Sequence, residues 1–341
     1  MSYTDIELIQ QVMDGNNLSE QQTHQLFTSI VTGEMDEIGI SALLTALKMK
    51  GETADEVAGA AKALEENALP FSKPDYPTAD NCGTGGDGTH TINISTICAI
   101  LSAACGVKVA KHGNRKVSSQ SGSADVLSEL GLKLDMSAEH ARHCLEKTNL
   151  TFLMAPVYHV GIKHAMPVRQ TLKTRTIFNI LGPLVNPAGS EIKVVGVYSE
   201  ELCLPVARSL KLLGKKAAWV VHGSGMDELA LHGPSKVVQL LDGEITEFEL
   251  TPEQFGLQRY DLSDLAGGTP KENAANIRQI LAGDGCEAHN TAVIFNTAPI
   301  LMLYGLAQDF ESAIELARTV LKSGKGLETL NQFVELTHQA S

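Results

Sequence analysis

Gly83-Thr84-Gly85-Gly86-Asp87-Gly88, followed by Asn93-Ile94-Ser95-Thr96, is the most informative stretch of this chain. Four glycines fall within six residues, and glycine lets backbone N–H groups converge on an oxyanion without an intervening side chain. The apolar run from Ile97 to Cys105 predicts a helix with Ser95 or Thr96 as its N-cap. Because a helix N-terminus behind a glycine loop binds anions, we expect a phosphorylated or pyrophosphorylated ligand here.

This pattern matches neither of the two common phosphate-binding fingerprints. The glycine spacing is not G-x-G-x-x-G, and no Gly-Lys-Ser or Gly-Lys-Thr ends the loop. The alternative interpretation is a plain turn between two packed elements. The rest of the chain has to distinguish the two.

Size and charge narrow the class of protein. A chain of 341 residues is long enough for about two domains with substantial cores. The net charge of −13 argues against a nucleic-acid-binding or membrane-surface protein, because both need a cationic footprint. An anionic small molecule can still bind where basic residues gather locally.

Cysteine usage and the N-terminal residues predict a cytoplasmic protein. The six cysteines form no C-x-x-C pair, so a zinc site of that type is not expected, and several lie in apolar runs as small core residues. A reducing compartment fits this usage best. Residues 1–17 contain acids and no long apolar stretch, so we do not expect a signal peptide, and no run reaches transmembrane length.

Residues 5–68 carry only helical patterns. Apolar residues recur there at helical spacing, and two capping boxes, Ser19 with Gln22 and Thr53 with Glu56, predict helix starts. Gly33 and Gly51 predict helix ends. We therefore expect residues 1–70 to form a small helical bundle domain.

A connector containing Pro70, Pro74 and Pro77 follows, and the pattern then changes. Short β-branched runs alternate with helical ones, which is typical of a mostly parallel sheet covered by helices. We expect strands at 107–110, 151–154, 193–198 and 217–221, a hairpin of 237–241 and 244–250 turning at Asp242-Gly243, and helices at 123–130, 200–213 and 269–281 with three more after residue 290. The predicted fold class is α/β, with a small N-terminal helical bundle and a larger α/β domain over residues 75–341.

A second cluster, Lys111-His112-Gly113-Asn114-Arg115-Lys116 with nearby serines at 118, 119, 121 and 123, follows the first of these strands. Ligands of open α/β sheets bind beyond the carboxyl ends of the strands. Three cations, an amide and several hydroxyls on one such loop suit a polyanion, since Lys supplies a point charge and Arg a planar fork. The alternative is a solvated basic loop.

Two carboxylates, Asp227 and Glu228, follow the expected strand at 217–221 and reach the same edge of the sheet. Adjacent carboxylates would repel a pyrophosphate unless Mg²⁺ lay between them, and Mg²⁺ takes one or two carboxylates plus phosphate oxygens and water. Considered alone, such a pair in a glycine loop is equally consistent with a solvated surface.

The segment 155–187 ends in a run dense in Gly, Pro and Asn, which predicts a defined crossing between the domains. Arg169 on this segment could hold a carboxylate bidentately, or it could form a structural salt bridge. His159 and His164 are expected to pack or to hydrogen-bond, and we assign them no chemistry.

In this order and spacing, the clusters resemble the anthranilate phosphoribosyltransferase family over nearly the whole chain. The matching motifs are Gly83–Asp87, Asn93–Thr96, Lys111–Arg115, Arg175–Pro187 and Met226–Glu228. Members are pentosyltransferases of tryptophan biosynthesis that join anthranilate to phosphoribosyl pyrophosphate. The resemblance therefore implies these two substrates, Mg²⁺ as the cofactor, a segment 165–185 that crosses back to the helical domain, and a homodimer built from the helical parts.

The resemblance also implies roles for individual residues. The positions that match those holding phosphoribosyl pyrophosphate are Gly83, Gly86, Asp87, Thr91, Asn93, Ile94, Ser95, Thr96, Lys111, His112, Gly113, Asn114, Arg115, Lys116, Val117, Ser118, Ser119 and Ser123. Gly83, Asn114 and Arg169 match positions that face anthranilate, and Ser95, Asp227 and Glu228 match the Mg²⁺ positions. Lys111 and Arg169 are the expected catalytic residues.

The chain departs from the family pattern near the expected acceptor side. Tyr158-His159 stands where members often carry two histidines, and Val160-Gly161-Ile162 stands where they carry Pro-Ala-Met or Pro-Ala-Leu. These departures concern the shape of the anthranilate channel and not the reaction.

Two other functions remain open from the sequence. A pyrimidine nucleoside phosphorylase has similar glycine and lysine loops in a related fold, although Arg169 and the Asp227-Glu228 pair argue against it. A non-enzymatic nucleic-acid-binding relative of the same fold would need a basic groove, which the net charge of −13 disfavours.

Overall fold

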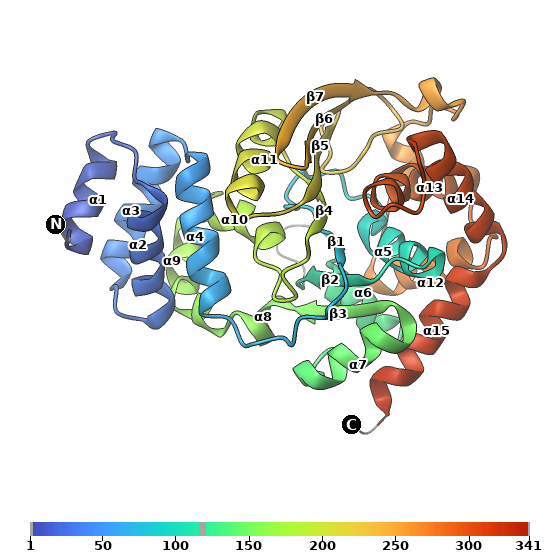
Figure 1. The fold of residues 1–341 in the computed structure, drawn as a ribbon, viewed down its shortest axis with the longest axis horizontal. Helices are drawn as coiled ribbons and strands as arrows, with labels where there is room; N and C mark the ends of the chain where they lie inside the picture. Colours follow the sequence, from blue (N-terminus) through green and yellow to red (C-terminus); the bar gives the residue numbers. More distant parts are fainter. Residues whose placement is uncertain (1–2, 116–120, 340–341) are drawn as a thin grey trace.

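The computed structural model describes residues 3–115 and 121–339, and its N-terminal part is a bundle of helices (Figure 1). The helices are α1 (Asp5–Met13), α2 (Glu20–Thr32), α3 (Glu37–Lys50) and α4 (Ala54–Glu66). The capping boxes expected at Ser19 and Thr53 are both present, and Gly33 ends α2 in the left-handed conformation. Local capping chemistry therefore sets these helix ends as the sequence predicts.

A seven-stranded sheet forms the centre of the larger part of the described chain. Its strands are β1 (Ala79–Asn81), β2 (Val109–Gly113), β3 (Leu150–Met154), β4 (Ile192–Gly196), β5 (Ala217–Gly223), β6 (Ser235–Leu241) and β7 (Glu244–Leu250). The order is β3-β2-β1-β4-β5-β6-β7, parallel from β3 to β5 and antiparallel for β6 and β7. The chain reverses its direction of travel between β1 and β4, which makes their carboxyl ends the switch point where ligands of such sheets bind.

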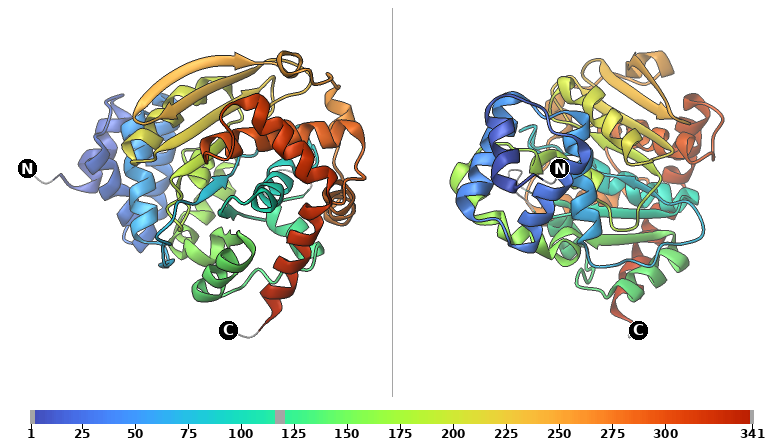
Figure 2. Two further views of the ribbon diagram at one scale, coloured as in Figure 1. Left: turned by 45° about the vertical axis from the view of Figure 1, so that its right-hand side comes forward. Right: turned by 60° about the vertical axis from the view of Figure 1, so that its left-hand side comes forward.

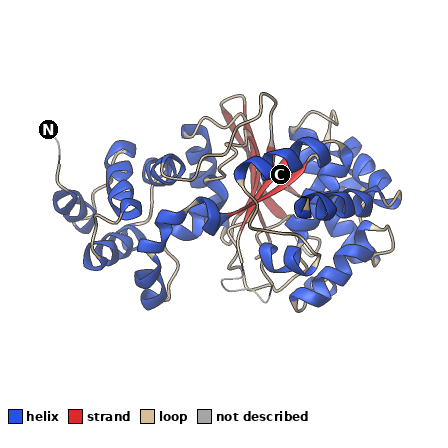
Figure 3. Ribbon diagram, turned by 90° about the horizontal axis from the view of Figure 1, so that it is seen from below, coloured by secondary structure: helices blue, strands red, loops and turns tan. Residues whose placement is uncertain are grey.

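Helices cover both faces of this sheet (Figure 3). The helices that follow the N-terminal bundle are α5 (Ile94–Cys105), α6 (Ser123–Glu129), α7 (Ala138–Thr148), α8 (Ala155–Tyr158), α9 (Met166–Leu172), α10 (Phe178–Leu181), α11 (Cys203–Leu212), α12 (Pro270–Leu281), α13 (Glu287–Leu303), α14 (Phe310–Lys322) and α15 (Lys325–His338), with short 3₁₀ turns at Val160–His164, Gly182–Leu184, Glu200–Leu202, Pro252–Phe255 and Leu262–Leu265. The N-terminal bundle lies at one end of the molecule, and α12 to α15 lie at the other (Figure 2). No helix in the described part of the chain is long and apolar enough to cross a membrane.

Two hydrophobic cores lie on opposite faces of the sheet. Alternate residues of β5 enter different cores: Trp219 packs with α5 and α12 to α15, whereas Ala218 and Val220 pack with α11 and the N-terminal bundle. The second core also includes residues of α9 and α10, such as Val168 and Phe178. The segment 165–185 therefore packs with the N-terminal helices although it lies far from them in sequence.

The predicted alternation of strands and helices is confirmed, although several elements begin or end a few residues from the predicted bounds. The hairpin turns at Asp242 and Gly243, whose φ angles of 48° and 84° are those of a type I′ turn. The expected helix at 200–213 begins as a 3₁₀ turn, and three helices follow near residue 290 as expected. The helix α7 and the three-residue strand β1 are present although no sequence pattern predicted them.

The predicted N-cap of α5 is wrong. The helix begins at Ile94 with Asn93 as its N-cap, so Ser95 and Thr96 lie in its first turn. The Asn93 side chain makes no capping bond because it is held by residues outside the helix. Tertiary hydrogen bonds have overridden the local capping preference: the Ile94 and Thr96 N–H groups donate to the carbonyl oxygens of Ile92 and Asn93, and the Ser95 N–H is directed at Glu228.

Candidate active site

The glycine loop emerges from β1 and is bound to the end of β4. The Thr84 N–H donates to the Gly196 carbonyl oxygen at 2.9 Å, and Thr84 Oγ1 accepts from the Tyr198 N–H at 3.1 Å. Gly85 and Gly86 have φ angles of 64° and 78°, a conformation that residues with a Cβ rarely adopt. The loop therefore has a defined, left-handed path at the switch point of the sheet.

The Asp227-Glu228 pair meets this loop directly. The Gly85 N–H donates to Asp227 Oδ2 at 2.7 Å, and a Cβ at Gly83 would lie 2.2 Å from the same oxygen. A Cβ at Gly196 would lie 1.6 Å from the Asp227 carbonyl oxygen, so this glycine allows the carboxylate segment to approach β4. Two separate segments, the loop itself and the end of β4, thus need their glycines for the carboxylate segment to lie against the loop.

Burial and neighbouring carboxylates raise the pKa values of Asp227 and Glu228. Burial, with the Asp87 carboxylate close by, raises the pKa of Asp227 to about 7. Burial is the main cause that raises the pKa of Glu228 well above its usual range, and the neighbouring Asp227 raises it further. Lys111 and the Ser95 N–H lower the same pKa but do not outweigh these two causes. Ser95, Asp227 and Glu228, the three positions predicted for Mg²⁺, therefore lie together.

The donor set at this place fits Mg²⁺. It offers carboxylate and hydroxyl oxygens, the ligands of a hard cation, and the two carboxylates repel each other until a cation neutralises them. In the described part of the chain, no three His, Cys, Asp or Glu side chains gather into a closed metal cage. An ion held by one or two carboxylates and completed by phosphate oxygens and water matches such an open arrangement.

The two predicted phosphate loops lie side by side. Lys111 Nζ donates to the Asn81 carbonyl oxygen at 2.6 Å, immediately before the glycine loop. Asn93 Nδ2 donates to the Ser121 carbonyl oxygen at 3.0 Å, and Asn93 Oδ1 accepts from Asn273 at 2.8 Å. Hydrogen bonds therefore join the segments that carry the two loops.

The residues of the second loop differ in what they can offer to a ligand. The Asn114 carbonyl oxygen accepts from the Ala124 N–H and from Ser123 Oγ, and exposed Arg115 pairs with Asp125 at 3.2 Å. A Cβ at Gly113 would lie 2.4 Å from Ser123 Oγ, so glycine allows the loop to close on α6. Lys116, Val117, Ser118 and Ser119 lie outside the described residues.

His112 turns its side chain away from the phosphate loops. Its Nδ1 lies 3.0 Å from the Gly182 carbonyl oxygen, and its ring packs against that of His159 with centroids 5.2 Å apart. Burial lowers the pKa of His112 to about 3, so the imidazole is neutral. Its side chain therefore belongs to the joint between β2 and the crossing segment.

The remaining predicted positions surround the start of α5. Ile94 and Thr96 are buried in its first turn, and Thr96 Oγ1 has no hydrogen-bond partner among the described residues. Thr91 forms a bridge with Ala266, and a Cβ at Gly267 would lie 2.4 Å from the Thr91 carbonyl oxygen. These residues shape the wall behind the glycine loop.

Arg169 is half-buried and has no ion-pair partner within residues 3–115 and 121–339. It lies on α9, its guanidinium covers the Phe178 ring at 5.1 Å, and burial lowers its pKa. The salt-bridge interpretation considered for this residue therefore has no partner in the described chain. An unpaired, partly desolvated guanidinium is suited to bind a carboxylate from outside.

Sequence reasoning missed a buried ion pair beneath the site. Lys193 of β4, with 0% side-chain exposure, pairs with Asp80 of β1 at 3.1 Å and donates to the Pro183 carbonyl oxygen at 2.8 Å. Asp80 Oδ1 also accepts from the His112 N–H at 3.1 Å. The available signal was a single lysine inside the apolar run Ile192–Val197. Asn273, which holds Asn93, carried no such signal.

Comparisons with known proteins agree with this geometry. The profile described as "Glycosyl transferase family, a/b domain" matches residues 75–327, and "Glycosyl transferase family, helical bundle domain" matches residues 6–68. An anthranilate phosphoribosyltransferase of Aeromonas salmonicida is 54% identical over 325 residues, covering 95% of this chain and 96% of that protein. The chain belongs to the anthranilate phosphoribosyltransferase family.

Solved structures of this family share the fold. The crystal structure of the Thermus thermophilus anthranilate phosphoribosyltransferase has 38% identity and a TM-score of 0.93, covering 97% of this chain and 99% of that one. The Saccharomyces cerevisiae anthranilate phosphoribosyltransferase, in complex with PRPP and Mg, has 29% identity and a TM-score of 0.89, covering 98% and 97%. The comparisons support neither a nucleoside phosphorylase nor a nucleic-acid-binding protein.

Of the departures from the pattern of the anthranilate phosphoribosyltransferase family, Tyr158 and His159 are buried packing residues. The Tyr158 ring meets Phe71 edge-on at 6.4 Å inside the larger core, and His159 Nε2 lies 2.8 Å from the Val185 carbonyl oxygen. Val160 beside them is partly exposed on the 3₁₀ turn. Tyr158 therefore packs in the larger core, and His159 contacts the end of the segment 155–187.

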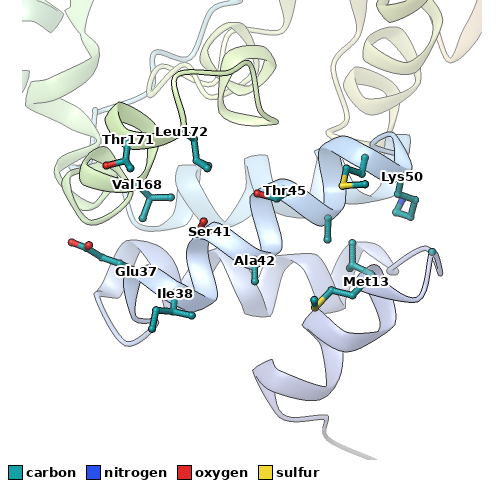
Figure 4. A pocket seen from close by; sticks show the side chains of 14 residues that line it. Met13, Glu37, Ile38, Ser41, Ala42, Thr45, Lys50, Val168, Thr171 and Leu172 are labelled. Carbon is teal, nitrogen blue, oxygen red and sulfur yellow. The ribbon is translucent and has the colours of Figure 1, made fainter.

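A large apolar groove lies away from the site. It has a volume of about 840 Å³ and is lined by residues of α1, α3 and α9 (Figure 4). Ile38 and Met49 on α3 are 80% and 83% exposed there. None of the predicted site residues lines this groove, and an exposed apolar surface of this kind is typical of an interaction site.

Proposed function

We propose that this protein transfers the phosphoribosyl group from phosphoribosyl pyrophosphate to the amine of anthranilate, releasing pyrophosphate. The observation that carries the proposal is the meeting of the glycine loop, Lys111 and the Asp227-Glu228 pair at one edge of the sheet. A polyanion with its metal needs all three, and a plain turn or a solvated basic loop needs none of them.

The leaving group is the main catalytic problem in this reaction. As the bond from C1′ to pyrophosphate breaks, positive charge grows on the ribosyl ring and negative charge grows on pyrophosphate. Lys111 is 3% exposed, so its ammonium acts on that charge in a poorly solvated place. Mg²⁺, held at Ser95, Asp227 and Glu228, would neutralise the same leaving group when bound.

The acceptor needs positioning more than activation. The aryl amine of anthranilate is neutral near pH 7 and has a lone pair, so no strong general base is required. Arg169 would hold the anthranilate carboxylate and direct the amine at C1′. Its lack of an acidic partner in the described chain supports this role.

The proposed domains are residues 1–70 together with the crossing segment 165–185, and residues 75–341. Packing of Val168 and Phe178 with the N-terminal helices supports this division. Closure of one domain on the other would exclude water from the ribosyl cation. We also propose a cytoplasmic location, which the six free cysteines support.

The helical domain is the proposed homodimer interface. A second copy of this chain would cover the groove between α1, α3 and α9, where Ile38 and Met49 are exposed. Sedimentation of the wild-type protein and of Ile38→Glu tests this directly. A monomeric wild type, or an unchanged dimer after the substitution, would contradict this interface.

The reaction is tested by mixing the protein with Mg²⁺, phosphoribosyl pyrophosphate and anthranilate and following the loss of anthranilate fluorescence. We expect the loss of fluorescence to require the protein, Mg²⁺ and phosphoribosyl pyrophosphate together. Thymidine or uridine with inorganic phosphate serves as the control for a phosphorylase. Fluorescence that stays constant at high protein concentration would overturn the proposal.

A further inference from the structure

Arg175 connects the segment that carries Arg169 to the glycine loop. It lies between α9 and α10, and its Nη2 donates to the carbonyl oxygen of Gly86. Its guanidinium also covers the Tyr198 ring, with Cζ 4.1 Å from the ring centroid. This side chain is exposed, and none of the roles assigned so far uses it.

The ring beneath Arg175 is itself attached to the loop. Tyr198 follows β4, and its N–H donates to Thr84 Oγ1 at 3.1 Å. Burial raises the pKa of the Tyr198 phenol and the Arg175 charge lowers it, as expected for a cation against a half-buried ring. The loop is thus held at Thr84 by the sheet and at Gly86 by the crossing segment.

The bond to the Gly86 carbonyl fixes more than one atom. A trans peptide is planar, so its C=O and the following N–H point in opposite directions. A contact that orients the Gly86 carbonyl therefore also orients the N–H of Asp87. Glycine has little intrinsic preference among backbone conformations, so Gly86 depends on such an external contact for its geometry.

We propose that Arg175 is a positioning residue, which orients the Gly86–Asp87 peptide for the donor's phosphates and links that loop to the segment that holds the acceptor. The inference rests on the proposed function, because it takes phosphoribosyl pyrophosphate as the ligand of the loop. The Tyr198 ring keeps the guanidinium over the loop, since a planar cation stacks on an aromatic face. Arg175 acts through the backbone and touches no reacting atom.

A second arginine–tyrosine stack gives a matched control. Arg142 covers the Tyr76 ring at 5.3 Å and donates to the Ser72 carbonyl oxygen at 3.1 Å. This pair joins α7 to the connector before β1, away from the glycine loop. Arg142→Ala therefore removes the same kind of contact without touching the proposed ligand site.

The test measures binding of Mg²⁺-pyrophosphate by calorimetry, which needs no turnover. We expect Arg175→Ala to weaken binding about tenfold, the cost of losing one charge-assisted contact, and Arg142→Ala to leave it unchanged. Tyr198→Leu keeps the cation and removes the stack, whereas Tyr198→Phe keeps both. We expect the Leu variant to bind severalfold more weakly than the Phe variant.

The kinetic arm separates positioning from a structural role. We expect Arg175→Ala to lower kcat and to raise the KM for the donor, with thermal stability no lower than that of Arg142→Ala. Wild-type binding and kinetics in Arg175→Ala, or equal binding by the two Tyr198 variants, would overturn the proposal. If the wild type binds Mg²⁺-pyrophosphate but consumes no anthranilate, the proposed function fails and the binding comparison still decides the role of Arg175.

Discussion

Arg169 is the residue on which acceptor binding depends in this interpretation. Arg169→Ala should raise the KM for anthranilate far more than the KM for phosphoribosyl pyrophosphate, because the lost contact is a bidentate grip on the anthranilate carboxylate. An increase of about tenfold to a hundredfold in the acceptor KM is the expected size for the loss of a charge-assisted pair. Steady-state kinetics with each substrate varied in turn measures both constants.

A conservative variant sharpens this test. Arg169→Lys keeps the charge but loses the planar fork, so its acceptor KM should lie between those of the wild type and the Ala variant. Unchanged anthranilate saturation in the Ala variant would remove Arg169 from the acceptor site.

Asp227 and Glu228 give the second residue-scale prediction. Their neutral counterparts, Asp227→Asn with Glu228→Gln, should weaken the dependence of activity on Mg²⁺, because uncharged oxygens hold a hard cation poorly. Titration of Mg²⁺ against activity, together with calorimetry of Mg²⁺-pyrophosphate, measures the effect. A double variant with a wild-type titration curve would show that the ion is held elsewhere.

The Asp80–Lys193 pair gives a stability prediction. Burial pushes the pKa of Asp80 upwards, but the ammonium groups of Lys193 and Lys111 outweigh it and hold the pKa below its usual range. Lys193→Met leaves this carboxylate buried without its partner, which costs about 3–5 kcal/mol. Urea denaturation measures the cost, and Asp80→Asn with Lys193→Met should recover much of it. A single variant within about 1 kcal/mol of wild type would contradict a paired state.

Residue types in the site were predictable where the chemistry demands a particular side chain. Four clusters, from Gly83 to Glu228, predict the ligand class because anions, metals and carboxylates each restrict their partners. Contacts made through backbone atoms were not predictable, since any residue offers a carbonyl. The bonds of Arg175 to Gly86 and of Lys111 to Asn81 are of this kind.

At the scale of elements, the crossing of α2 and α4 depends on one glycine. A Cβ at Gly59 would lie 2.2 Å from the Glu20 carbonyl oxygen, so Gly59→Ala forces two helices apart. We expect a loss of about 1–3 kcal/mol in the free energy of unfolding, although Ala favours a helix more than Gly does. Chemical denaturation followed by circular dichroism measures it.

Gly39 on α3 is the matched control for this prediction. A Cβ at Gly39 would meet the flexible Met35 side chain at 3.1 Å, so Gly39→Ala should be neutral or slightly stabilising. Equal effects of the two substitutions would mean that helix propensity, and not packing, governs Gly59.

Elements were predictable where their signals are local. The capping boxes at Ser19 and Thr53 and the Asp242-Gly243 turn fix their ends through neighbouring residues alone. The start of α5 was mispredicted because Asn93 is held by Ser121 and Asn273, which lie 28 and 180 residues away. Strand β1 has three residues, too few for a periodic pattern, and owes its place to pairing on both sides.

At the scale of the whole molecule, a short stretch of backbone joins the two cores. Residues 182–185 accept hydrogen bonds from three buried side chains of the larger part: His112 to Gly182, Lys193 to Pro183 and His159 to Val185. The joint therefore depends on two histidines that stay neutral. No local signal marks it in the sequence, because its acceptors are all carbonyls.

Acid should therefore destabilise the folded protein by protonating these two buried histidines in the unfolded chain. Burial lowers the pKa of His112 to about 3 and also lowers that of His159, whereas an unfolded histidine has a pKa of about 6.5. Between those values the unfolded chain binds protons that the folded chain refuses, so the stabilisation is complete above about pH 6.5 and is lost as the pH falls. Each histidine that stays neutral in the folded chain lowers the free energy of unfolding by about 1.4 kcal/mol for every pH unit of acidification in this window.

Urea unfolding at several pH values should show this slope, and His112→Asn with His159→Gln, which retain amide donors, should flatten it. The exposed His143→Gln is the control and should leave the slope unchanged; a double variant as acid-sensitive as the wild type would show that other groups carry the effect.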